Sequence, residues 1–325
     1  MKAYFLQSTE KEMKLELRDA PRPEPKPGQL LVRVRAASLN RGELIVGHGL
    51  TAAGAAKRAG VDGAGEVEGT GKRPDSNAQK GMRVMGRLPG SFAEYALMDE
   101  EDAIPVPDNL SWEDAAATPI TFLVVYDMLV QQGGLKAGEW LLITGVSSGV
   151  GVAALQAGKA LGAKVIGTSG SSEKLQKLKS LGLDVALQTR KPDFSKAVLE
   201  ATGGKGVNLV VNNVGGSVFA ETIKCLAYMG RHATVGYLDG VMEGKMDIEA
   251  LHSKRLKLFG VSNKLRTAEQ RGETVKGFTR DFLPLFESGK LKPLIDKVYD
   301  FKDLPAAKTR MEGDAHAGKI VVKIS

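Results

Sequence analysis

The stretch Leu141-Leu142-Ile143-Thr144-Gly145-Val146-Ser147-Ser148-Gly149-Val150-Gly151 leads directly into an apolar, alanine-rich segment at 152–162. The run at 141–143 predicts a buried strand, the small residues after it predict a tight turn, and apolar positions three to four residues apart predict a following helix. The start of such a helix directs backbone N–H groups at an anion, and small turn residues let a ligand approach closely. The stretch therefore predicts a strand–turn–helix able to hold a dinucleotide pyrophosphate.

The match to the pattern Gly-x-Gly-x-x-Gly is incomplete. Val146 and Ser148 stand where the first two glycines belong, and Gly151 is the third. Gly145 and Gly149 fall just outside the frame. Because many glycine-rich turns bind nothing, this turn does not identify a cofactor site by itself.

Length and composition narrow the class of protein. A chain of 325 residues exceeds the usual single core, which predicts two domains, and 42% hydrophobic with 26% charged residues is typical of a globular protein. The sequence has no apolar run long enough to span a bilayer, and residues 1–7 predict a first strand rather than a secretory signal. A single cysteine, Cys225, excludes an internal disulfide and a cysteine-clustered metal site, so we expect a cytoplasmic protein.

The net charge of +7 is mildly basic, and the lysines and arginines are spread along the chain. This distribution indicates a solvated surface first, and attraction for phosphorylated cofactors or nucleic acid only second. We therefore expect a small-molecule substrate, with neither a membrane nor a nucleic acid as the main partner.

Residues 1–120 are predicted to be β-rich. Short strand candidates separated by turn signals indicate a barrel-like or sandwich-like unit, with strands at 2–6, 15–18, 30–37, 61–67, 83–85 and 92–97. Ser111, followed by Glu113 and Asp114, predicts the capped start of a helix through 115–117.

From residue 121 the pattern alternates between strands and helices, which predicts a doubly wound parallel sheet. Strands are expected at 141–143, 163–168, 185–187, 207–211, 232–235 and 256–259, and helices from Ser172 to Gly182 and at 193–201, 218–229 and 267–288. Strand candidates at 297–301 and 319–324 flank a helix at 305–312 and return to the first domain. The expected domains are 121–290, and 1–120 together with 291–325.

The end of the second strand decides between the two nicotinamide cofactors. A unit that prefers NAD carries an acidic residue there to bind the ribose 2′-hydroxyl, but this chain has Ser169, followed by more hydroxyls and Lys174. Hydroxyls and cations suit a 2′-phosphate, so NADPH (NADP+) is the expected cofactor. Glu173 is explained by its place in the first turn of the next helix. The alternative is that Ser171 and Ser172 serve only as a helix cap.

Taken together, the motifs resemble the medium-chain dehydrogenase/reductase superfamily, in its zinc-independent quinone oxidoreductase and enoyl-reductase branch. The matching segments run in family order at 36–43 (AASLNRGE), 62–71 (DGAGEVEGTG), 81–86 (GMRVMG), 90–95 (GSFAEY), 104–110 (IPVPDNL), 213–216 (NVGG) and 316–321 (HAGKIV). The resemblance implies a GroES-like catalytic domain interrupted by a Rossmann domain, with the cofactor in the cleft between them. It also implies a homodimer formed through the edge strand at 256–260.

The resemblance also bears on zinc. The positions that hold catalytic zinc ligands in the zinc-dependent branch are occupied here by Asn40, Val61 and Ile120, and the segment 74–80 lacks the cysteines of a structural zinc lobe. The four histidines show no ligand spacing. Without a Lewis acid, alcohol oxidation loses its main catalyst. A quinone or an α,β-unsaturated carbonyl can still accept hydride when a hydrogen bond stabilises the developing oxyanion or enolate.

The resemblance assigns roles to individual residues. Asn40 is implied as a hydrogen-bond donor near the substrate carbonyl, with a strand-end turn residue as the alternative, and Tyr126 as a tyrosine beside the cleft, with a core tyrosine as the alternative. The implied cofactor contacts are Ser147, Ser148, Gly149 and Val150 at the pyrophosphate, Asn213, Val214, Gly236 and Tyr237 near the ribose and nicotinamide, Ser262 and Asn263 at the nicotinamide amide, and Arg190 and Lys319 at the adenosine phosphate, beside Ser169 and Lys174.

The chain departs from the family pattern at Val124 and Thr189, and residues 40–49 lack the substrate-loop tyrosine of dedicated enoyl-thioester reductases. The sequence therefore predicts an NADPH-dependent reductase of quinones or activated enones. One alternative is an enoyl-thioester reductase, whose phosphorylated carrier would suit Lys57 and Arg58 in the loop 47–60. The other is a non-catalytic NADPH-binding or RNA-binding relative.

Overall fold

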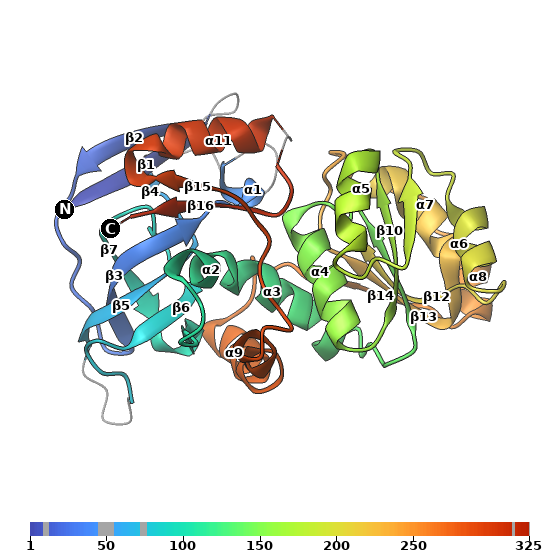
Figure 1. Ribbon diagram of the computed structural model, residues 1–325, viewed down its shortest axis with the longest axis horizontal. Helices are drawn as coiled ribbons and strands as arrows, with labels where there is room; N and C mark the ends of the chain where they lie inside the picture. The colour runs from blue at the N-terminus through green and yellow to red at the C-terminus, as the bar shows by residue number, and fades with distance from the viewer. Residues whose placement is uncertain (9–12, 45–54, 72–76, 314–315, 325) are drawn as a thin grey trace. The chain divides into compact units, whose positions relative to one another are not determined.

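The computed structural model describes residues 1–8, 13–44, 55–71, 77–313 and 316–324. Its internal contacts divide the chain into two units, Met1–Leu123 with Lys264–Ser325, and Val124–Asn263. The first unit is β-rich and the second is a parallel sheet with helices on both faces, so the predicted fold class is confirmed (Figure 1). Among the described helices, none combines the length and apolar character needed to cross a membrane.

The sheet of the second unit is parallel throughout. In spatial order its strands are β11 (Val185–Gln188), β10 (Lys164–Ser169), β9 (Trp140–Thr144), β12 (Val207–Asn212), β13 (Leu226–Thr234) and β14 (Lys257–Gly260). Figure 1 shows α4 and α5 on one face of this sheet and α6 and α7 on the other. The helices are α4 (Gly149–Ala160), α5 (Ser172–Lys179), α6 (Ser195–Ala201), α7 (Gly216–Cys225) and α8 (Ile248–Ser253).

The strand order reverses at β9, because β10 lies on one side of it and β12 on the other. In open α/β sheets, ligands bind at the carboxyl ends of the strands beside such a reversal. The turn between β9 and α4 is therefore the expected binding position. Ser148 begins α4 as its N-cap, since its side chain accepts a hydrogen bond from the N–H of Gly151.

The incomplete glycine pattern has a packing explanation. A Cβ atom at Gly167 of β10 would lie 2.7 Å from Cγ1 of Val146, so the glycine of the neighbouring strand leaves room for the branched side chain. A Cβ at Gly151 would lie 2.5 Å from the carbonyl oxygen of Gly145, which keeps glycine at that place. Gly145 itself has a φ of 62°, a conformation that favours glycine. The small residue that the glycine pattern expects at position 146 is thus found instead at Gly167, in the neighbouring strand β10.

The first unit contains a seven-stranded sheet and a three-stranded sheet. The larger sheet has the order β15 (Ile295–Asp300), β16 (Lys319–Lys323), β3 (Gln29–Ser38), β5 (Asp62–Thr70), β6 (Arg83–Arg87) and β8 (Ala103–Pro105), with β7 (Tyr95–Asp99) paired to β3. The smaller sheet is β2 (Met13–Asp19), β1 (Lys2–Ser8) and β4 (Lys57–Arg58). The helices are α1 (Arg41–Leu44), α2 (Trp112–Ala117), α9 (Ala268–Asp281), α10 (Leu283–Glu287) and α11 (Leu304–Glu312), while α3 (Pro119–Tyr126) crosses from the first unit into the second.

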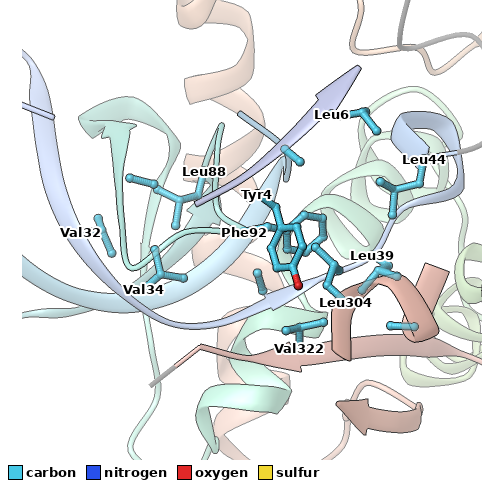
Figure 2. Close-up of a cluster of buried hydrophobic side chains, with 14 of the residues drawn as sticks. Tyr4, Leu6, Val32, Val34, Leu39, Leu44, Leu88, Phe92, Leu304 and Val322 are labelled. Carbon is cyan, nitrogen blue, oxygen red and sulfur yellow. The ribbon is translucent and has the colours of Figure 1, made fainter. Parts of the chain in front are cut away.

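The core of the first unit joins the two ends of the chain. Tyr4 and Leu6 of β1 pack in one buried cluster with Val32 of β3, Leu304 of α11 and Val322 of β16 (Figure 2). Apolar side chains at alternate positions of β3 supply one wall of this cluster, as the period-two pattern at 30–37 predicts. Burying them fixes β16 against β3, which places the C-terminal segment beside residues 36–38.

Among the element boundaries that differ from the expected ones, the end of α7 and the start of α5 have a clear cause, and the helix expected at 267–288 is divided into α9 and α10. The helix predicted at 218–229 ends at Cys225, and Leu226 begins β13, because Leu226 pairs with Val207 in the parallel sheet. The cap of α5 is Ser171, whose side chain accepts from the N–H of Lys174, rather than Ser172. At the end of α7 the helical periodicity continues past the point where the helix stops, whereas at the start of α5 the cap lies one residue earlier than expected.

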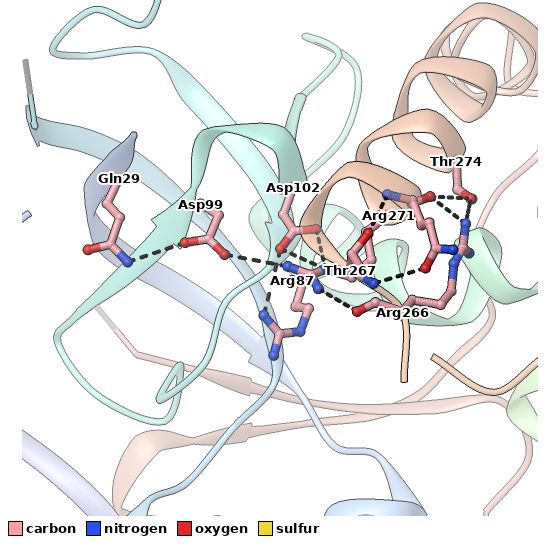
Figure 3. Close-up of polar contacts among 9 residues, drawn as sticks. Gln29, Arg87, Asp99, Asp102, Arg266, Thr267, Arg271 and Thr274 are labelled. Atoms are coloured by element: carbon pink, nitrogen blue, oxygen red, sulfur yellow. Dashed lines mark hydrogen bonds and ion pairs between the residues drawn. The ribbon is translucent and has the colours of Figure 1, made fainter. Parts of the chain in front are cut away.

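The segment 264–290 makes its contacts within the first unit, whereas the sequence analysis assigned this segment to the Rossmann domain. Arg271 of α9 donates hydrogen bonds to the carboxylates of Asp102 at 3.1 Å and Asp99 at 3.5 Å, and Gln29 also donates to Asp99 (Figure 3). Arg87 lies 3.7 Å from Asp102. Because Asp102 is 2% exposed, its charge depends on these partners, which anchor α9 to the first unit.

Candidate active site

In the second unit, the start of α4 offers backbone N–H donors. Ser148 accepts the N–H of Gly151, so the N–H groups of Gly149 and Val150, which precede the first intrahelical bond, are left to a ligand. The hydroxyl of Ser147 lies 3.1 Å from the hydroxyl of Ser169 at the end of β10. The four residues expected at the pyrophosphate thus lie together in the turn that begins α4, where a helix directs its unpaired N–H groups outward.

Hydroxyl and cationic side chains surround the end of β10. Ser169 accepts a hydrogen bond from the N–H of Ser171 at 3.3 Å, and Lys174 stands in the first turn of α5. Arg190 lies across Gly170, because a Cβ there would be only 2.1 Å from its Nε. Both cations therefore come from segments that adjoin Ser169, as a 2′-phosphate site requires.

Glu173, the acidic residue near this site, is turned toward its own helix. Its carboxylate forms an ion pair with Lys177 at 2.8 Å, one turn further along α5. Hydrogen bonding by Lys177 lowers the pKa of Glu173. This pairing agrees with the interpretation of Glu173 as a first-turn acid rather than as a ligand for a ribose hydroxyl.

The loop after β12 is held by an amide and hydroxyl network. The side-chain amide of Asn213 donates to the carbonyl oxygen of Thr144 at 2.9 Å, and the Oδ1 of Asn212 accepts the N–H groups of Val214 and Gly215, each at 3.1 Å. The amide of Asn213 therefore holds the loop in place, and its backbone carbonyl also accepts the N–H of Leu238 at 3.3 Å.

The remaining expected cofactor residues follow neighbouring strands. The N–H of Gly236 lies 3.4 Å from the carbonyl oxygen of Asn212, which brings the ends of β12 and β13 together beside Tyr237. Ser262 follows β14 and is exposed. Parallel strands thus place Val214, Gly236 and Ser262 at the same edge of the sheet as the α4 turn.

In the first unit, Asn40 lies in a buried polar cluster. Its Nδ2 donates to Oδ1 of Asp62 at 2.8 Å, and its Oδ1 accepts from the ammonium of Lys319 at 2.8 Å. The hydroxyl of Ser38 donates to the same Asp62 oxygen at 3.0 Å. Glu43 accepts the backbone N–H of Asn40 at 3.2 Å. These residues come from β3, α1, β5 and β16, so the cluster forms only when the sheet is assembled.

Burial governs the electrostatics of this cluster. Asp62 is 0% and Lys319 is 7% exposed. Burial raises the pKa of Glu43 to about 8, and repulsion from Asp62 adds to this effect. Burial likewise raises the pKa of Asp62 and lowers the pKa of Lys319, while the attraction between these two groups opposes both shifts.

Tyr126 and Lys319, two residues with expected roles, are both buried. Tyr126 is 2% exposed at the end of α3. Lys319, expected at the adenosine phosphate, directs its ammonium at Asn40 and at the carbonyl oxygen of Leu39, 3.1 Å away. The structure thus brings Lys319 to Asn40, the expected catalytic residue of the first unit. Of the loop 47–60, residues 47–54 lie outside the described residues.

The residues at the three zinc-ligand positions do not fit zinc. Val61 and Ile120 have hydrocarbon side chains, and the amide of Asn40 is engaged by Asp62 and Lys319. In the described parts of the chain, no three histidine, cysteine, aspartate or glutamate side chains gather as a metal site.

Asp62 and Glu43 belong to the sequence motifs at 62–71 and 36–43, but the sequence alone predicted no role for them. The available signal was an acidic residue followed directly by the small residues Gly63, Ala64 and Gly65 at the start of a strand, since a buried carboxylate requires partners. What the sequence did not show was that Lys319, more than 250 residues away, supplies the compensating charge.

Comparisons with known proteins agree with the two-unit fold. The family model described as alcohol dehydrogenase GroES-like domain matches residues 26–108, and the one described as zinc-binding dehydrogenase matches residues 149–273. Among curated relatives, the chain is 31% identical over 302 residues to a highly reducing polyketide synthase 40 of Fusarium pseudograminearum. That alignment covers 92% of this chain and 12% of the relative, so the chain spans about an eighth of that relative's length.

Solved structures match over nearly their whole length. An NAD-dependent alcohol dehydrogenase is 30% identical with a TM-score of 0.86, and all of each chain is covered. A quinone oxidoreductase of Pseudomonas syringae pv. Tomato DC3000 is 27% identical with a TM-score of 0.83, again with all of each chain covered. The CurK enoyl reductase is 25% identical with a TM-score of 0.82, and 99% of each chain is covered.

The pKa of Glu43 predicts how stability depends on pH. The folded state binds a proton at Glu43 up to about pH 8, whereas the unfolded chain releases it near 4.5. Stability from this group is therefore complete below pH 4.5 and is lost as the pH rises toward 8, with a slope of up to ~1.4 kcal/mol per pH unit. Glu43→Gln should flatten the free energy of unfolding, measured by urea denaturation, between pH 5 and 8. The exposed Glu24→Gln serves as the control, and equal curves for wild type and Glu43→Gln would contradict the prediction.

Proposed function

Because the chain belongs to the medium-chain dehydrogenase/reductase superfamily of oxidoreductases, we propose that it is a zinc-independent, NADPH-dependent reductase of quinones or α,β-unsaturated carbonyls. The observation that carries this proposal is the Asn40 site. A side-chain amide stands where a zinc ligand would be needed, and two buried charges hold it in place. An acceptor that is already electrophilic needs only this kind of hydrogen-bonding assistance.

NADPH supplies the hydride, and residues of the second unit are proposed to hold it. The N–H groups of Gly149 and Val150 would bind the pyrophosphate, with Ser147 beside them. Arg190 and Lys174 would bind the 2′-phosphate, because both adjoin the neutral end of β10 at Ser169. The loops after β12 and β13 would line the nicotinamide ribose.

Asn40 is proposed to bind the acceptor. Its Nδ2 carries two hydrogens, and one of them is taken by Asp62. The other can donate to the oxygen of a quinone or enone, where negative charge develops as hydride arrives at carbon. The fully buried Tyr126 is less suited to this contact, and we propose a packing role for it instead.

An enoyl-thioester reductase remains the second candidate. The similarity of the chain to an enoyl reductase and to a highly reducing polyketide synthase favours this candidate. A quinone oxidoreductase among the solved structures favours the first candidate. The absence of the substrate-loop tyrosine from the sequence at 40–49 also favours the first candidate.

A homodimer through β14 is part of the proposal. β14 is the edge strand of its sheet, and the exposed apolar side chains nearby include Leu258 on β14 and Tyr228 and Met229 on the neighbouring β13. Pairing two copies of this edge across a two-fold axis would cover these side chains. Sedimentation velocity should give twice the mass of one chain. Leu258→Asp should shift it to monomer, whereas the matched Leu265→Asp should not; a monomeric wild type would refute the dimer.

The acceptor is tested by steady-state kinetics. NADPH and NADH consumption is compared with 1,4-benzoquinone, a simple enone and crotonyl-coenzyme A. We expect turnover with the quinone or the enone and a higher kcat/KM with NADPH. Turnover of the thioester alone would establish the second candidate, and NADPH binding without any turnover would indicate a non-catalytic relative. Activity that depends on one bound zinc per chain would overturn the metal-free proposal.

The cofactor preference is tested at Arg190. Arg190→Ala should raise the KM for NADPH about 10- to 100-fold, because a charge-assisted hydrogen bond to phosphate is lost. The KM for NADH should change less than about two-fold, since NADH lacks that phosphate. Gly170→Ala should act in the same direction, because the new Cβ would displace Arg190. The exposed Lys196→Ala removes the same charge elsewhere in the unit as a control. Equal changes for both cofactors would contradict the assignment.

A further inference from the structure

The side-chain amide of Asn40 lies between two opposite charges. Its Oδ1 faces the Lys319 ammonium at 2.8 Å, and its Nδ2 faces the Asp62 carboxylate at 2.8 Å. An ammonium only donates hydrogen bonds and an ionised carboxylate only accepts them. One of the two orientations of the amide therefore satisfies both neighbours, and the flipped orientation satisfies neither.

This arrangement leaves one N–H of Asn40 for another partner. The nearest alternative acceptor for Nδ2 is the carbonyl oxygen of Ser38 at 3.5 Å, which is at the outer limit of a hydrogen bond. Asn40 is partly exposed, whereas Asp62 and Lys319 are buried beneath it. Of these three residues, Asn40 is therefore the one with surface left for another molecule to contact.

The two charges are themselves held in place. Lys319 also donates to the carbonyl oxygen of Leu39 at 3.1 Å, and Asp62 also accepts from the hydroxyl of Ser38 at 3.0 Å. The ammonium lies 3.9 Å from Oδ2 of Asp62, an oxygen without a hydrogen-bond partner among the described residues. The two opposite charges thus lie on either side of the Asn40 amide, and the shortest hydrogen bond of each charged group is to that amide.

We propose that Lys319 and Asp62 are positioning residues that fix the orientation of the Asn40 amide, so that it presents an Nδ2 hydrogen to the acceptor oxygen. Donation from Lys319 to Oδ1 also draws electron density from the amide, which strengthens the remaining N–H as a donor. The inference rests on the proposed function, because it specifies how that site assists reduction. Its chemistry suits a carbonyl or quinone oxygen, which only accepts.

The decisive variant exchanges the two side chains. Asn40→Asp with Asp62→Asn keeps the same atoms and the same net charge around Lys319, but it places an acceptor-only group where the acceptor oxygen would bind. If the pair positions a donor, this double variant should regain most of the stability lost in Asp62→Asn alone, yet its kcat should stay about 100-fold or more below wild type. A double variant with wild-type kcat would overturn the proposal.

Single variants separate positioning from binding. Lys319→Met should lower kcat about 10- to 100-fold while the KM for NADPH changes less than about two-fold, because the donor is weakened and not removed. Ser91→Ala is the matched control, since Ser91 donates to the backbone oxygen of Asp62 at 2.9 Å and not to its carboxylate. Its kcat should equal that of wild type. A kcat in Lys319→Met within two-fold of wild type would overturn the proposal.

A spectrum of the unliganded protein provides a readout that does not require activity. With 15N-labelled asparagine, the two side-chain N–H signals of Asn40, assigned by their loss in Asn40→Ala, should be widely separated in wild type because one hydrogen faces a carboxylate. The separation between the two signals should decrease in Asp62→Asn, and the signals should shift in Lys319→Met. Unchanged signals in both variants would overturn the positioning role. If the signals change in the variants but the wild-type protein reduces no acceptor, the positioning role of Asp62 and Lys319 would stand and the proposed function would be refuted.

Discussion

The compensation of one buried ammonium organises the first unit. Lys319 is 7% exposed, and a lysine at that depth persists only where acceptors and an opposite charge surround it. Asp62 of β5, the amide of Asn40 and the carbonyl oxygen of Leu39 supply them. Burial of apolar side chains places β16 beside β3, and the charges of Lys319 and Asp62 then require that the ends of β16 and β5 lie close together. The same contacts hold the Asn40 amide, which we propose assists hydride acceptance without a metal.

The second unit works by a different principle, because its donors are mainly backbone groups. The start of α4 presents N–H groups, and the residues around it are small because the backbone approaches itself closely at Gly151 and Gly167. Side chains are added only at the end of β10, where Arg190 and Lys174 adjoin Ser169. The proposed residues for cofactor choice, Arg190 and Lys174, are thus different from the backbone groups proposed to bind the pyrophosphate.

Much of this arrangement could be predicted. The alternation of strands and helices from residue 121 predicted the parallel sheet, and the small residues at 145–151 predicted the turn before α4, because local hydrogen bonds and sterics set both. Predictions were wrong where a long-range contact decides. Leu226 continues the helical periodicity of α7 but pairs with Val207, and α9 follows the Rossmann sheet in sequence but is anchored through Arg271 to Asp102.

The sequence by itself determined the family, the two kinds of domain, the strand–turn–helix that begins at β9 and the absence of an acidic residue at position 169, since each depends on residues close together in the chain. Only the tertiary structure decided what the side chain of Asn40 contacts. Its partners Asp62 and Lys319 stand 22 and 279 residues away, and neither shows from sequence that it will be buried beside the other. Burial converts two ordinary charges into a pair that holds one amide in one orientation, and burial is a property of the assembled sheet.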